Sequence, residues 1–102
     1  MQAQELAKKM KSGQSPCVLD VRSGGEYRAG HIPGAVHAPS WKILLRVASL
    51  PEKKDAPVVV TCENGPRAML AKSFLDARGY RNVELLEGHM AGWRRGGLPT
   101  ER

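Results

Sequence analysis

Cysteines, aromatic residues and long apolar runs are all scarce in this sequence. Two cysteines are too few for the disulfide framework of a small secreted domain. Two Trp, two Tyr and one Phe leave little to stack on nucleic-acid bases. No apolar run approaches the ~20 residues of a membrane-spanning helix, and the N-terminal segment MQAQELAKKMK lacks the apolar core of a signal peptide. We therefore expect a cytoplasmic protein that binds neither nucleic acid nor membranes.

Acidic residues are also fewer than basic ones, which gives the chain a net charge of +6. Lys and Arg are scattered rather than gathered in a tract, so the excess charge favours solubility or attraction of small anions over nucleic-acid binding. A chain of 102 residues can bury one core but not two. We expect a single domain over residues 1–102.

Short apolar runs alternate with helical patterns along the chain, which predicts an α/β fold around a small, mostly parallel sheet. The clearest strand is the β-branched run VVVT, bounded by a proline and by a Gly-Pro segment. The predicted strands cover residues 17–21, 35–37, 58–61 and 83–86. The predicted helices cover residues 4–11, a short stretch ending at 29, 41–49, a stretch from about 66 that ends before 79, and 90–94.

Two of these helices have start signals. Ser23 and Glu26 have the spacing of a capping box, so a short helix should follow to Ala29. Ser40 is expected to cap the helix over residues 41–49, with Leu44 and Val47 on its apolar face. The two tryptophans, Trp41 and Trp93, are expected to pack in the core or over a loop edge.

The two cysteines should not form a disulfide. Cys17 opens one predicted strand, and Cys62 follows the end of a parallel neighbour. Opposite ends of four-residue strands lie roughly 13 Å apart, and a disulfide needs Cα atoms within about 7 Å.

The most informative stretch is VVVTCENGPRAMLA, which places Cys62 where a strand ends and Arg67 where a helix begins. Ligands bind at the carboxyl ends of parallel strands. Gly65 permits a tight turn with inward N–H groups, and Pro66 suits the first position of the helix. Inward N–H groups, the helix N-terminus and a nearby Arg all favour a thiolate. We predict a reactive Cys62, with a buried structural thiol as the alternative. The residues expected to surround its sulfur are Glu63, Asn64, Gly65, Pro66, Arg67 and Ala68.

Four motifs then occur in order along nearly the whole chain. They are LDVR at 19–22, EYRAGHIPGA at 26–35, the loop CENGPR at 62–67, and the closing segment LLEGHMAGWRRGGLPTE. The loop has the form C-x-x-G-x-R, and the closing segment is similar to G-G-x-x-x-W-x-x-x-G-x-P. With these motifs the chain resembles the rhodanese-like domain of the sulfurtransferase superfamily, in its single-domain type.

The resemblance implies a three-layer α/β fold with helices on both faces of the sheet. It also implies that Cys62 accepts sulfane sulfur from thiosulfate or a persulfide. The Cys62 persulfide would pass this sulfur to cyanide, a small thiol or a protein acceptor, without a metal or other cofactor. Two further readings stay open: a sulfur-carrier or regulatory interaction module with little turnover, and a phosphatase or arsenate reductase. The six-residue loop from Cys62 to Arg67 is the length that the family uses for sulfur, whereas its oxyanion enzymes have one residue more.

Asp20 and Arg22 are expected to support the loop from the neighbouring strand. Asp20 is predicted to pair with Arg67 and hold the loop, while Arg22 adds positive charge. Glu63 places a negative charge beside Cys62 and is expected to make thiosulfate a poor donor. The sequence also departs from the family pattern at His89, where a glycine is common, and at Ala68, where serine is common. His31 and His37 are expected to be structural, because the histidines and cysteines lack zinc-ligand spacing.

Overall fold

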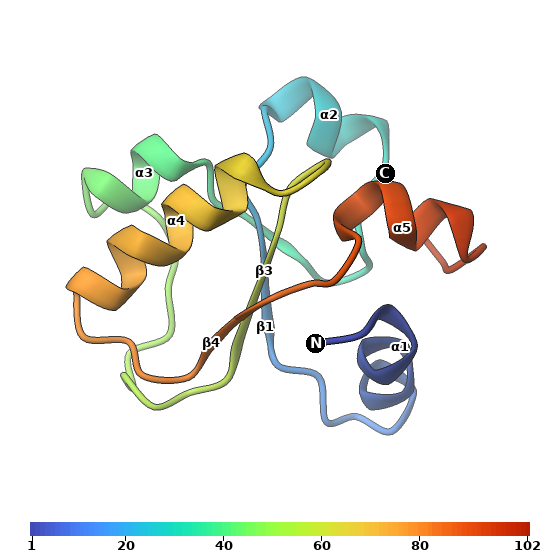
Figure 1. Ribbon diagram of the computed structural model, residues 1–102, viewed down its shortest axis with the longest axis horizontal. Coiled ribbons are helices and arrows are strands. Elements are labelled where there is room, and N and C mark those ends of the chain that lie inside the picture. Colours follow the sequence, from blue (N-terminus) through green and yellow to red (C-terminus); the bar gives the residue numbers. More distant parts are fainter.

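The computed structural model describes residues 1–102 as five helices and four strands that alternate along most of the chain (Figure 1). The strands are β1 (Cys17–Asp20), β2 (Val36–His37), β3 (Val58–Thr61) and β4 (Val83–Leu85). The helices are α1 (Ala3–Lys11), α2 (Gly24–Ala29), α3 (Ser40–Leu44), α4 (Pro66–Ala77) and α5 (His89–Arg95).

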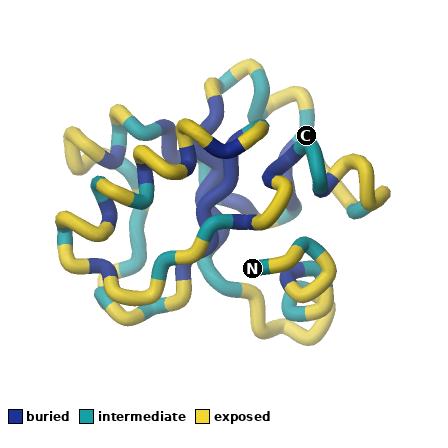
Figure 2. Tube along the Cα trace, in the orientation of Figure 1, coloured by how far each residue is buried: buried dark blue, intermediate teal, exposed yellow.

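The four strands form one sheet in the order β2-β1-β3-β4, and every neighbouring pair is parallel. Cys17 pairs with Val58 and Asp20 with Thr61, so β1 and β3 end side by side. All four residues of β3 are buried, as expected for a central parallel strand covered on both faces. Figure 2 shows this burial concentrated along the middle strands. The carboxyl ends of β1 and β3 therefore share one edge of the sheet, where the Cys62 loop begins.

Helices cover both faces of the sheet, which confirms the predicted fold class. Figure 1 shows α3 and α4 on one side of the strands and α1 and α5 on the other, with α2 beside the loop that follows β3. Alternate strand residues serve the two layers, because successive side chains point to opposite faces. The α3/α4 layer buries residues such as Leu19, Val60, Ile43, Ala71 and Leu75. The α1/α5 layer buries residues such as Val18, Val59, Leu6, Met90 and Trp93.

The helix predicted over residues 41–49 is wrong in its extent. Helix α3 ends at Leu44, and Ser40 is its first residue rather than a side-chain cap. Arg46 has φ of 62°, which turns the chain and ends the helical register. Ala48 and Leu50 pack against the core after that turn, so Leu44 and Val47 are left 58% and 63% exposed.

The two tryptophans have opposite environments. Trp93 is fully buried, as predicted, and its indole N–H donates to the carbonyl oxygen of Pro99 at 2.8 Å. Trp41 is 57% exposed, so the first of the two predicted environments, the core, is wrong for this residue. It lies on the outer side of the short helix α3, whose inward position is filled by Ile43.

The capping box at the start of α2 is confirmed. The backbone N–H of Glu26 donates to the Ser23 hydroxyl, and the Glu26 carboxylate accepts the Ser23 backbone N–H.

The longest helix in the chain is α4, with 12 residues, and no helix has the length and apolar character needed to cross a membrane.

Candidate active site

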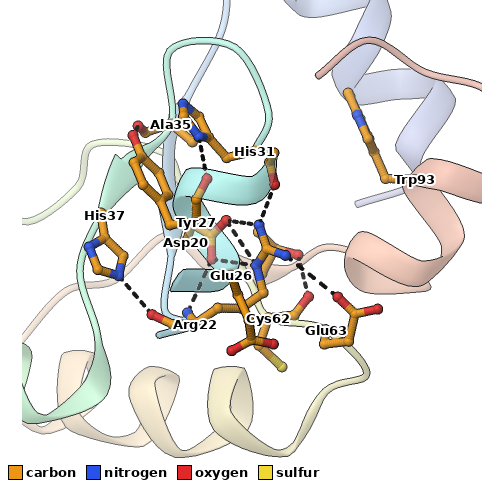
Figure 3. Close-up of polar contacts among 12 residues, drawn as sticks. Asp20, Arg22, Glu26, Tyr27, His31, Ala35, His37, Cys62, Glu63 and Trp93 are labelled. Atoms are coloured by element: carbon orange, nitrogen blue, oxygen red, sulfur yellow. Dashed lines mark hydrogen bonds and ion pairs between the residues drawn. The ribbon is translucent and has the colours of Figure 1, made fainter. Parts of the chain in front are cut away.

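Cys62 lies directly after β3 and is fully buried. Figure 3 shows its side chain at the end of the strand, with the sulfur directed towards the start of α4. The backbone N–H of Gly65 donates to Cys62 Sγ at 3.0 Å. Helix α4 begins at Pro66, so the sulfur faces the positive end of a 12-residue helix. A hydrogen-bond donor and a helix N-terminus both stabilise an anionic sulfur at this position.

Gly65 is needed for this turn on two grounds. Its φ of 132° and ψ of −43° lie outside the range that other residues readily adopt. A Cβ added at this position would also lie 3.3 Å from Nε2 of His89. Gly65 supplies the backbone hydrogen bond that reaches the sulfur. Pro66 has no N–H to contribute and occupies the first turn of α4, as the sequence predicts.

The first turn of α5 supports the Cys62 loop from behind. The backbone N–H of Met90 donates to the carbonyl oxygen of Cys62 at 2.9 Å, and that of Ala91 donates to Glu63 at 3.2 Å. The N–H groups of a first helical turn lack partners within the helix. Here two of them hold the main chain on both sides of the bond between Cys62 and Glu63.

His89 adds a side-chain contact to the same support. Its Nδ1 accepts the backbone N–H of Cys62 at 3.3 Å. Burial lowers the pKa of His89, which favours the neutral ring with a free lone pair on Nδ1. The residue has φ of 51°, in the region that glycine prefers. Sequence reasoning noted the replaced glycine but not this contact, which joins positions 27 residues apart.

Asp20 and Arg22 form a buried ion pair with each other (Figure 3). Nε of Arg22 donates to Oδ1 of Asp20 at 3.0 Å, and Nη2 donates to Oδ2 at 2.8 Å. The backbone N–H of Arg22 also donates to Oδ1 of Asp20 at 3.1 Å. Nη2 of Arg22 donates to the carbonyl oxygen of Gly30 at 2.8 Å. Removing one partner of such a buried pair costs about 3–5 kcal/mol. The pair therefore fixes the end of β1 beside the Cys62 loop.

The predicted pairing of Asp20 with Arg67 is wrong. Arg67 pairs instead with Glu26 of α2, through Nη1–Oε1 at 2.6 Å and Nη2–Oε2 at 3.1 Å. The carboxylate of Asp20 is already bound on both oxygens by Arg22, which lies two residues away in the sequence. The bond from Arg67 lowers the pKa of Glu26 to about 2, and it raises the pKa of Arg67 in turn. A negative charge on Cys62 makes a smaller contribution to the raised pKa of Arg67.

Glu63 is compensated by cations on two sides. It pairs with Arg94 of α5, and its Oε1 lies 3.5 Å from Nη1 of Arg22. The isolated negative charge expected beside Cys62 is therefore largely offset. A small cavity of about 320 Å³, lined mainly by charged and polar residues, lies next to these groups. Its walls include Arg22, Glu26, Glu63 and Arg94.

The remaining histidines have structural partners, as predicted. Nδ1 of His31 lies 2.8 Å from the carbonyl oxygen of Tyr27, and the rings of His31 and Tyr27 stack on each other. His37 Nε2 lies 2.7 Å from the carbonyl oxygen of Arg22. No three His, Cys, Asp or Glu side chains gather where they could hold a metal ion. Both cysteines are free.

Comparison with known proteins places this geometry in a family. The family model described as Rhodanese-like domain matches residues 2–95. A sulfurtransferase of Allochromatium vinosum is 32% identical over 97 residues, which cover 95% of this chain and 89% of that protein. The thiosulfate sulfurtransferase GlpE of Pseudomonas fluorescens is 37% identical over 83 residues, or 79% of this chain and 72% of the relative.

The fold has a close match among solved structures. The crystal structure of the Alr3790 protein from Anabaena sp. superposes with a TM-score of 0.88 at 30% identity. The match covers 99% of this chain and 81% of that one. The order and packing of the elements described above are thus shared with an experimentally determined member of the same fold.

Proposed function

The chain belongs to the rhodanese-like domain family, and on that premise we propose that it is a sulfurtransferase that carries sulfane sulfur as a persulfide on Cys62. The observation that carries the proposal is the hydrogen bond from the Gly65 N–H to Cys62 Sγ at the N-terminus of α4. A donor and a helix end aimed at one sulfur stabilise its anion. The relatives named sulfurtransferases support the same chemistry.

The transfer has two displacement steps. The Cys62 thiolate attacks the outer sulfur of thiosulfate and forms a new S–S bond. The original S–S bond breaks, and sulfite leaves with its electron pair. An acceptor thiolate or cyanide then attacks the terminal sulfur of the persulfide, and Cys62 departs as a thiolate. In each step the nucleophile supplies the electron pair of the new bond and the leaving group takes the pair of the old one. The electrons therefore balance, and the proposal requires neither a redox cofactor nor a metal. A thiolate already stabilised by Gly65 needs no separate general base.

We propose that the ion pair between Arg67 and Glu26 controls access to the sulfur. Cys62 is fully buried, whereas the side chains of Arg67 and Glu26 are 44% and 35% exposed. Partly exposed side chains change rotamer without unfolding the domain. We propose that an anionic donor displaces Glu26 from Arg67 and takes its place. The guanidinium would then bind the sulfonate end of thiosulfate while the outer sulfur approaches Cys62.

Mass spectrometry of the reduced protein after treatment with thiosulfate tests this function. We expect the mass of one sulfur atom to be added to the protein and to map to Cys62. The Cys62→Ser variant should gain nothing, and the Cys17→Ser variant should load as the wild type does. Cys17 is a free, half-buried thiol at the opposite end of the sheet, which makes it a matched control. A wild-type protein that gains no sulfur from thiosulfate or from a small persulfide would refute the proposal.

The short loop weighs against phosphate or arsenate as the substrate. Only Gly65 donates a backbone hydrogen bond to the sulfur, and Pro66 has no N–H to offer an oxyanion. We expect no hydrolysis of a small aryl phosphate by this protein. Its two free thiols suit a reducing compartment, and on that ground we propose a cytoplasmic location.

A further inference from the structure

The large exposed apolar side chains of this protein are confined to one region. Six such residues are at least half exposed, and all belong to α3, the turn after it, or the first half of α4. Soluble proteins rarely collect apolar groups in this way unless the surface binds something. The six residues are Trp41, Leu44, Leu45, Val47, Met69 and Leu70.

Three of these six line a groove of about 730 Å³, which we call the α3/α4 groove. Trp41, Leu44 and Leu70 form its apolar walls together with Phe74. Arg67, at the end of the Cys62 loop, lines it as well. The groove therefore runs from an apolar surface to Arg67, the last residue of the Cys62 loop.

The charge along the groove has a single sign. Its lining contains the cations Arg22, Lys42 and Arg67 and no Asp or Glu. Arg22 and Arg67 are neutralised by carboxylates that lie outside the groove. Lys42 takes part in no ion pair and lies 5.6 Å from the ring centroid of Trp41. The groove thus offers an uncompensated positive charge directly beside its largest apolar side chain.

We propose that the α3/α4 groove docks an apolar, acidic segment of a protein that receives sulfur from Cys62. The inference rests on the proposed sulfurtransferase function. A groove of this volume is in the range that encloses ligands much larger than cyanide, thiosulfate or a simple thiol. Its apolar walls fit leucine-like side chains, and Lys42 fits a carboxylate between them. In the transfer, the partner's cysteine thiolate attacks the terminal sulfur, the S–S bond to Cys62 breaks, and Cys62 leaves as a thiolate. The acceptor sulfur is oxidised to a persulfide as the Cys62 sulfur is reduced.

The first arm of the test measures docking without sulfur transfer. Two synthetic peptides share the same leucine pattern and carry serine in place of cysteine; one contains glutamates and the other lysines. Binding is followed by the change in tryptophan fluorescence. The change is assigned to Trp41, because Trp93 is fully buried and does not line the groove. We expect the acidic peptide to bind about tenfold more tightly than the basic one. We also expect Leu44→Ser or Leu70→Ser to weaken its binding about tenfold, because each removes buried apolar surface.

The chain supplies matched controls for these variants. Leu45 and Met69 neighbour Leu44 and Leu70, are similarly exposed, and do not line the groove. Leu45→Ser and Met69→Ser should change binding less than twofold. Lys42→Glu should reverse the preference between the acidic and the basic peptide.

The second arm measures transfer from the Cys62 persulfide to the same peptides carrying cysteine. The ratio of the rate with the acidic peptide to the rate with free cysteine should fall about tenfold in the groove variants and stay unchanged in the controls. Equal rates with acidic and basic peptides, or equal effects of groove and control variants, would overturn the docking proposal. So would a wild-type dimer in sedimentation that Leu44→Ser converts to a monomer, because a second copy would then occupy the groove.

The two arms separate this inference from the proposed function. If Cys62 never accepts sulfur while the serine peptide still binds in the groove, the sulfurtransferase function fails and the docking site stands. If Cys62 accepts sulfur but the acidic peptide binds no more tightly than the basic one, the docking proposal fails and the sulfurtransferase function stands.

Discussion

The backbone N–H of Cys62 donates a hydrogen bond to Nδ1 of His89 across 3.3 Å, which joins the end of β3 to the first residue of α5. His89 holds a φ of 51°, a conformation that costs a non-glycine residue of order 1 kcal/mol. The hydrogen bond offsets part of that cost and fixes the peptide that carries the sulfur. The pair thus connects the closing motif of the family to the Cys62 loop.

A pH dependence of stability follows from the burial of His89. Burial lowers the pKa of the folded ring, so below the ordinary pKa of about 6.5 the unfolded chain binds more protons than the folded chain. Stability associated with His89 is therefore present above that pH and is lost as the pH falls through the lowered value. His89→Asn should keep an acceptor for Cys62, tolerate the positive φ and lose this dependence. Urea unfolding from pH 8 to 5 measures the difference, which can reach about 1.4 kcal/mol per pH unit.

His31 and His37 are present in both proteins, so subtracting the two profiles isolates the contribution of His89. A His89→Asn profile that falls as steeply with acid as that of the wild type would show that His89 does not stay neutral in the fold.

Gly65→Ala should damage both stability and sulfur loading. The substitution places a methyl group 3.3 Å from His89 Nε2 and strains a φ of 132°. We expect a loss of about 2–3 kcal/mol in the free energy of unfolding and slower loading of Cys62 by thiosulfate. Gly34 has φ of 80° with nothing within 4 Å of an added Cβ, so Gly34→Ala should cost only about 1 kcal/mol and load normally. Denaturant unfolding and mass spectrometry measure the two effects. Equal losses in both variants would contradict the role given to the contact with His89.

Glu26→Gln should expose Cys62 to electrophiles. The substitution weakens the ion pair with Arg67 but keeps a side-chain oxygen for the capping box with Ser23. We expect alkylation of Cys62 by iodoacetamide at pH 7.5 to rise about threefold to tenfold, since an exposed arginine freed from its partner moves readily and favours the thiolate. The rate is measured by mass spectrometry in a Cys17→Ser background.

The control for Glu26→Gln is Asp76→Asn, which removes the exposed pair between Lys72 and Asp76 on α4, the helix that carries Arg67. It should leave the alkylation rate unchanged. The pKa of Glu26 is about 2, so its stabilising charge is present above its ordinary pKa and is lost only as the pH falls through about 2. Any titration of the wild-type rate between pH 5 and 9 therefore belongs to other groups. An unchanged rate in Glu26→Gln would show that the pair does not limit access to the sulfur.

Local patterns in the sequence were sufficient for most of the architecture. The β-branched run at 58–61 and the capping box of Ser23 and Glu26 both specify their elements through neighbouring residues, and both occur as predicted. The end of α3 was missed because Arg46 adopts a positive φ that its side chain does not signal. Tertiary packing of the residues after the turn decides that conformation.

The candidate site was predictable in its position but not in its ion pairs. The position of Cys62 after β3 follows from the β-branched run that precedes it in the sequence. The partner of Arg67 does not, because Glu26 lies 41 residues away and had already been explained by its role as a helix cap. Glu26 takes part in both the capping box and the ion pair with Arg67, and only the capping box leaves a pattern in the neighbouring sequence.

The last residues of the chain return to the segment that leads into β2. Glu101 exchanges two backbone hydrogen bonds with His31, and its carboxylate accepts the N–H of Gly34 at 2.9 Å. The family match stops at residue 95, before these contacts. A fragment trimmed to that boundary would remove the acceptor of the buried Trp93 indole at Pro99 and the antiparallel bridge between His31 and Glu101. Boundaries drawn from family likeness alone would therefore yield a weakened domain.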